Sequence, residues 1–150
     1  MKQVTRQRQN TQRGNASVEF ALSFALLWSV VSGVYQLGHS LYVYNQLSVA
    51  MSTAARFAGR DSIGSVKDGY SNRIKNVAVY GNPEGTGEPM VKGLATSNID
   101  VDIQEDGEGV PRNVTVGVNQ FKVDGVFWST NLVDKPYSTV RYSGRWQPFV

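Results

Sequence analysis

Residues 13–44 read RGNASVEFALSFALLWSVVSGVYQLGHSLYVY, and this stretch decides the fold. After Glu19 no Asp, Glu, Lys or Arg occurs before Arg56, and residues 20–37 are uncharged and mostly apolar. A helix of about 20 such residues crosses the ~30 Å hydrocarbon core of a bilayer, because it satisfies its own backbone hydrogen bonds there. We therefore predict a membrane span at about residues 20–42. Glu19, a carboxylate where the apolar run begins, does not fit a plain membrane anchor.

The charges before this stretch are all positive. Residues 1–14 carry Lys2, Arg6, Arg8 and Arg13 and no acid, whereas the net charge of the whole chain is only +3. Such a bias beside a membrane helix predicts a cytoplasmic N-terminus and an outer C-terminal part. No aromatic residue lies among these charges, so we expect no nucleic-acid partner. The absence of cysteine excludes disulfides and thiolate chemistry.

Three fates are open for a basic segment followed by an apolar one. A cleaved signal peptide has a shorter apolar run and a small-x-small site, and the nearest candidate, Ser48-Val49-Ala50, lies ten residues past Leu37. An uncleaved signal anchor explains the length and the charge but leaves Gly14 and Glu19 without a role. The third fate is processing at RGNASVEF, which resembles the cleavage site of a type IV prepilin.

This third hypothesis gives each residue of the motif a role. Gly14 has no side chain, so a membrane-embedded peptidase can approach the bond between Gly14 and Asn15 closely. Cleavage there creates an α-amine on Asn15, and Glu19 shares its helix face at spacing i, i+4. We therefore expect prepilin cleavage at Gly14 and Asn15 and an assembly role for Glu19. Gly33 and Gly38 are candidates for close helix packing, or ordinary glycines of a membrane helix.

Periodicity predicts one helix over Asn15 to about Ala58, because apolar or small residues recur at helical steps between Leu41 and Ala58. A weaker helical pattern covers residues 65–76. We expect strands at 77–80, 99–104, 114 to about 121, and 137–142, where apolar residues alternate or cluster between turn formers. Residues 123–136, with Val126, Phe127, Trp128 and Leu132, form either a partner-facing loop or, as we prefer, part of the core.

These elements define an α+β fold. A long N-terminal pilin-like helix, its first half transmembrane, carries a small antiparallel β-sheet domain packed on its outer half. The expected domains are a cytoplasmic leader at 1–14, a long helix at 15–60, and a periplasmic α+β domain at 61–150.

With RGNASVEF, the apolar run, YQLGHSLYVYNQLSVA and AARFA in place, the chain resembles the TadE-like minor pseudopilins of the tight adherence (Flp, type IVb) pilus system. The resemblance implies cleavage by a prepilin peptidase, residence in the bacterial inner membrane, contact with other pilin subunits, and support of pilus assembly. Two positions depart from the family's pattern: His39 follows Gly38, where a small residue and a basic residue often follow as a pair, and Ala55 stands where a glycine is expected. The alternatives are an uncleaved membrane-anchored periplasmic binding module and a type II secretion pseudopilin.

The sequence contains no complete set of residues for a catalytic or metal-binding site. His39 is the only histidine, so neither a Ser-His-Asp triad nor a two-histidine metal site can form. The acidic residues between Asp100 and Glu108 miss the EF-hand pattern, and we interpret them as a solvated loop rather than a calcium site. We expect no enzyme activity, no cofactor and no metal.

Overall fold

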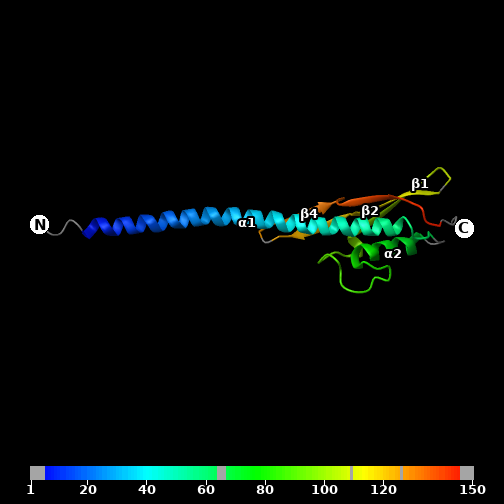
Figure 1. Ribbon diagram of the computed structural model, residues 1–150, viewed down its shortest axis with the longest axis horizontal. Helices are drawn as coiled ribbons and strands as arrows, with labels where there is room; N and C mark the ends of the chain where they lie inside the picture. The colour runs from blue at the N-terminus through cyan, green and yellow to red at the C-terminus, as the bar shows by residue number, and fades with distance from the viewer. Residues whose placement is uncertain (1–5, 64–66, 109, 126, 146–150) are drawn as a thin grey trace. The chain divides into compact units, whose positions relative to one another are not determined.

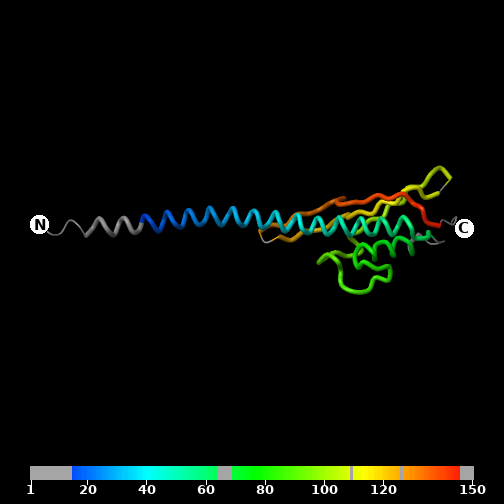
Figure 2. Tube along the Cα trace, viewed as in Figure 1, coloured from blue at the N-terminus to red at the C-terminus, as the bar shows by residue number. Residues whose placement is uncertain are grey.

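A computed structural model describes residues 6–63, 67–108, 110–125 and 127–145 (Figure 1). Its contacts define two units, Met1–His39 and Ser40–Val150, which we describe separately. The first unit is helical. The second contains two helices, a short 3₁₀ turn and five strands, and its chain is traced in Figure 2. The predicted α+β fold, a long apolar helix with a short helix and small antiparallel sheets packed on it, is confirmed.

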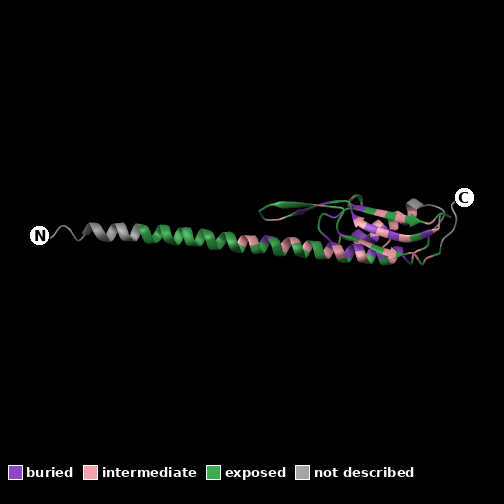
Figure 3. Ribbon diagram, turned by 90° about the horizontal axis from the view of Figure 1, so that it is seen from above, coloured by how far each residue is buried: buried purple, intermediate pink, exposed green. Residues whose placement is uncertain are grey.

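Helix α1 runs from Arg6 to Ala58 and contributes to both units. Its end agrees with the prediction, but it begins nine residues before the predicted start at Asn15. The segment before Asn15 is rich in Gln and Arg, which are good helix formers, and the single Gly14 costs only about 1 kcal/mol relative to alanine. The first five residues, with Lys2, lie outside the described residues. From Asn15 to Val31 every described side chain is exposed (Figure 3).

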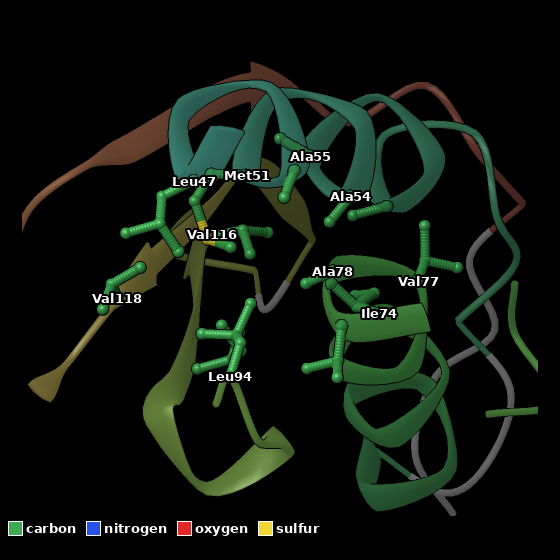
Figure 4. Packing of buried hydrophobic residues seen from close by; sticks show 14 of the residues in the cluster. Leu47, Met51, Ala54, Ala55, Ile74, Val77, Ala78, Leu94, Val116 and Val118 are labelled. Atoms are coloured by element: carbon green, nitrogen blue, oxygen red, sulfur yellow. The ribbon is translucent and has the colours of Figure 1, made fainter. Parts of the chain in front are cut away.

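In the second unit one face of α1 forms the centre of the hydrophobic core. Leu47, Met51, Ala55 and Ala58 are fully buried, as the predicted stripe requires, and Ala54 beside them is buried too. Figure 4 shows Leu47, Met51, Ala54 and Ala55 packed between α2 and the sheet. The first two members of the predicted stripe, Leu41 and Tyr44, are exposed and do not contribute to the core. The buried stripe therefore begins only at Leu47.

Helix α2 spans Lys67–Tyr80. The predicted helix at 65–76 is confirmed in type, although Ser65 and Val66 lie outside the described residues. The predicted strand at Val77–Tyr80 is wrong, since these residues form the last turn of α2. The preference of valine for strands is small and depends on the packing around it. As part of α2, Val77, Ala78 and Val79 all lie in the core. Gly81, at φ +77°, ends the helix by donating its N–H to the Val77 carbonyl at 3.0 Å.

The main sheet has three antiparallel strands in the order β1-β2-β5, with β1 at Ile99–Glu105, β2 at Pro111–Val118 and β5 at Tyr137–Arg141. The 3₁₀ turn η1, Thr96–Asn98, leads into β1. The predicted alternation holds, because Val114, Val116 and Val118 of the central strand are buried. All three predicted strands exist, and β5 ends one residue before the expected Tyr142.

A second sheet is a hairpin of β3, Gln120–Asp124, and β4, Ser129–Val133. The predicted continuation of one strand to Phe121 is wrong. Asn119 separates β2 from β3. Its N–H donates to the Asn98 carbonyl at 2.8 Å, in register with the last β1–β2 pair, whereas the next residue, Gln120, pairs with Val133 in the other sheet. The preferred core role of residues 123–136 is also wrong for Phe127 and Trp128, which are exposed. Leu132 is half-buried, whereas Val126 lies outside the described residues.

Candidate functional site

The predicted processing residues lie on one continuous stretch of α1. Gly14 and Asn15 are both within its helical backbone, and the side chains of Asn15 and Glu19 are exposed. Four residues of helix advance about 6 Å along the axis, and residues at this spacing share a face. The fold therefore places Asn15 and Glu19 on the same face of the first unit.

The surface that follows Glu19 is apolar all round. Among the described residues, Asn15–Ala58 is the helix that is long and apolar enough to cross a membrane, and its mean hydropathy reaches 1.6. Large apolar side chains from Val18 to Leu37 are exposed. An unbroken helix with such a surface is stable where lipid covers it, because lipid removes these side chains from water.

The same surface carries a groove of small residues. Ala21, Ala25, Ser29 and Gly33 recur at steps of four, which forms one row along the helix. The adjacent row on one side is Phe20, Phe24 and Trp28, and the row on the other side is Leu22, Leu26, Val30 and Val34. Two ridges of large side chains thus border one shallow groove. Small residues of this kind let the backbone of another helix approach closely.

The aromatic ridge is internally ordered. The ring centroids of Phe20 and Phe24 lie 6.3 Å apart, and those of Phe24 and Trp28 lie 6.1 Å apart, with interplanar angles of 22° and 19°. These separations fall in the range of favourable aromatic contacts. The ridge beside the groove therefore has a defined shape.

The two predicted packing glycines occupy different faces. Gly33 belongs to the small groove, whereas Gly38 lies five residues later and points elsewhere on the helix. A Cβ added at either position meets nothing within 4 Å. Neither glycine is required by the chain's own packing, so both positions leave space for another helix.

The acidic segment of the second unit forms a loop with internal hydrogen bonds. The Asp106 carboxylate accepts the backbone N–H groups of Val110 and Glu108 at 3.0 and 3.1 Å, and these donors hold its pKa below the usual range. Within the part of the chain that the structure describes, no group of three or more His, Cys, Asp or Glu side chains could hold a metal ion. Asp100 and Asp102 lie on the exposed face of β1.

The fold and the helix surface define a class: an α+β protein with one N-terminal apolar helix consistent with a single membrane span. Sequence comparison then identifies a family resemblance for one segment of the chain. The family model of TadE-like proteins matches residues 14–56, so the resemblance of this segment to TadE-like proteins is confirmed. A comparison with curated proteins gives no match, and a comparison with solved structures gives none.

Sequence reasoning missed the groove and misassigned the hairpin aromatics. The signal for the groove is the recurrence of small residues at every fourth position from Ala21 to Gly33, between two rows of large ones. No comparable signal separates Phe127 and Trp128 from core residues, because their exposure follows from the tertiary position of the β3–β4 hairpin.

Proposed function

We propose that this chain is a minor pseudopilin that supports the assembly or initiation of a thin adhesive Flp pilus. At the level of class, the TadE-like segment and the apolar helix support an association with the Tad pilus and a structural, non-enzymatic role. One coincidence carries the finer proposal. The family match begins at Gly14, and the carboxylate of Glu19 stands five residues later, at the start of the apolar run.

The proposed topology assigns a task to each part. Residues 1–14 are a basic cytoplasmic leader, residues 15–60 form the helix that spans the inner membrane, and residues 61–150 form a periplasmic domain. The partners are a prepilin peptidase, other pilin or pseudopilin subunits, and the membrane itself. The excess of basic residues before the span supports this orientation.

The proposed chemistry centres on the amine that cleavage exposes. Removal of the leader after Gly14 gives Asn15 a free α-amine one helical turn from Glu19. A charged carboxylate at membrane depth costs a few kcal/mol unless it is paired, and an acid in the first turn also complements the helix dipole. The new amine, or the amine of a neighbouring subunit, therefore stabilises Glu19 within the membrane.

Mass spectrometry of the N-terminus of protein purified from its native membrane tests the cleavage. We expect a mature chain beginning at Asn15. Gly14→Leu should leave the leader attached, because its side chain obstructs the scissile bond, whereas Gln9→Ala in the same leader should still be processed. An intact leader on the wild-type protein would refute the proposal.

Glu19→Ala tests the assembly role separately. We expect normal processing but fewer pili in electron micrographs of cells, because the carboxylate partner of the amine is lost. Glu19→Gln keeps the shape without the charge and should behave like Glu19→Ala, whereas Ser23→Ala, one turn further along the same row, should assemble normally. Wild-type piliation in both Glu19 variants would contradict the assigned role.

One observation favours a second candidate, an uncleaved membrane-anchored periplasmic module. Helix α1 continues through Gly14 without a break, as a permanent anchor would. Mass spectrometry of the N-terminus distinguishes the two candidates, since only the uncleaved anchor keeps residues 1–14 in the mature protein.

A further inference from the structure

The turn of the β3–β4 hairpin presents two exposed aromatic side chains. Phe127 is 53% exposed and Trp128 is 56% exposed. Their ring centroids lie 6.5 Å apart, so the two rings form a single apolar surface. The Gly125 N–H donates to the Trp128 carbonyl at 3.2 Å, and Asp124 pairs with Ser129, so Gly125 and Trp128 lie together at the end of a paired ribbon.

The hairpin is anchored in the core along strand β3. Phe121 and Val123 of β3 are buried in the core cluster that includes Leu47 of α1. The turn begins only one residue after Asp124, and strands rise about 3.3 Å per residue. The aromatic pair is therefore held at a defined distance from the core by a short, paired support.

The turn projects at a specific end of the second unit. In both views the hairpin extends past the three-stranded sheet on the side where α1 enters this unit at Ser40 (Figures 1 and 3). Residues 40–44 of α1 at that end include the exposed Leu41, Tyr42 and Tyr44, which directly continue the apolar run. Two separate segments thus present aromatic residues at the same end of the unit.

The charges around the turn suit a lipid headgroup region. Lys122 and Asp124 pair at 3.1 Å and offset each other. Ser129, Thr130 and Asn131 are exposed and uncharged. Tryptophan and tyrosine gather where membrane meets water, because an apolar ring and a polar N–H or O–H group suit that boundary.

We propose that Phe127 and Trp128 insert into the outer interface of the bilayer that α1 spans, so that the hairpin is a second membrane contact of the periplasmic domain. The occupant of this surface is the phospholipid headgroup and upper acyl region. The inference rests on the proposed membrane span, and the experiment below separates failure of the span from failure of the hairpin contact.

The test uses the full chain in phosphatidylcholine and phosphatidylglycerol vesicles, with or without phosphatidylcholine brominated near the headgroup end of its acyl chains. The chain has three tryptophans, so W28F combined with W146F leaves Trp128 as the only reporter. We expect its emission to lie at short wavelength and to be quenched by the brominated lipid. Absence of quenching would overturn the proposal. Unquenched emission at long wavelength would show that Trp128 lies in water, and unquenched emission at short wavelength would show that protein covers it.

Two matched reporters complete the design. W128F combined with W146F leaves Trp28, which reports the span and should be quenched. If Trp28 is quenched and Trp128 is not, the hairpin contact is wrong and the span stands; if neither is quenched, both are wrong. Val133→Trp, with the three native tryptophans replaced by Phe, places a reporter at the far end of β4, about 13 Å from the turn. It should remain unquenched, and quenching there would refute a contact confined to the turn.

Discussion

At the scale of single residues, Tyr70 joins α2 to the end of α1. Its ring is buried, and its hydroxyl donates a hydrogen bond of 2.6 Å to the Ala58 carbonyl. This bond satisfies one of the last α1 carbonyls, which have no partner within the helix. Burial raises the pKa of Tyr70 well above its ordinary value, nearby Tyr142 and Asp61 raise it further, and Arg73 opposes them.

Tyr70→Phe should lower the free energy of unfolding by about 1–2 kcal/mol near neutral pH, because the Ala58 carbonyl loses its donor. Above about pH 10 the unfolded chain releases the Tyr70 proton while the folded chain keeps it, so the stability from this group falls as pH rises. The difference in the free energy of unfolding between the wild type and Tyr70→Phe should therefore decrease with increasing pH. Denaturant unfolding in detergent from pH 7 to 11 measures this difference in free energy. Tyr137→Phe, at an exposed site, is the control, and a gap that widens with pH would contradict the argument.

At the scale of elements, the sequence predicts best where local pattern and burial agree. Strands β1 and β2 alternate apolar and polar residues, and their apolar side chains do face the core. The pattern fails where tertiary position decides. Val77–Tyr80 look like a strand but form the last turn of α2. Their apolar pattern does not distinguish the two states, because either a helix or a strand could bury these side chains. Strand β4, almost entirely exposed, has no apolar alternation that could reveal it.

The end of α1 is set by a close approach at Gly59. A Cβ there would lie 2.8 Å from Val140 Cγ1 and 3.1 Å from the Arg141 carbonyl oxygen, both in β5. Ser143 donates its backbone N–H and its hydroxyl to the Gly59 carbonyl, which holds the strand end in place. The space for a side chain is thus absent where helix and sheet meet.

Gly59→Ala should therefore destabilise the protein by about 1–3 kcal/mol, as overpacking does. Gly69→Ala is the matched control, because a Cβ at Gly69 meets nothing within 4 Å and alanine favours helix over glycine by up to about 1 kcal/mol. Thermal unfolding followed by circular dichroism in detergent compares the two variants. Equal melting temperatures would show that the β5 end moves away freely.

At the scale of the whole molecule, the helix that carries the candidate site was predictable because its signals are local, while the roles of Gly14, Asn15 and Glu19 stay predictions. Arg6, Arg8, Arg13, Gly14, Glu19 and the apolar run all lie within one continuous helix, so their order in the sequence is their order in space. The membrane contact proposed for Phe127 and Trp128 was not predictable in this way. It depends on strand pairing between residues 120–124 and 129–133 and on where that hairpin projects.

The groove of Ala21, Ala25, Ser29 and Gly33 gives the last prediction, since the proposed role in a pilus requires contact between subunits. If a neighbouring pilin helix packs into this groove, Ala25→Leu fills it and separates the two backbones. We expect fewer pili and weaker co-purification with pilin, with normal cleavage and membrane level. Val31→Leu enlarges a side chain on the opposite row of the same helix and should leave assembly unchanged. Equal losses in both variants would mean that bulk on α1, rather than the groove, limits assembly, and unchanged piliation in Ala25→Leu would place the contact on another face.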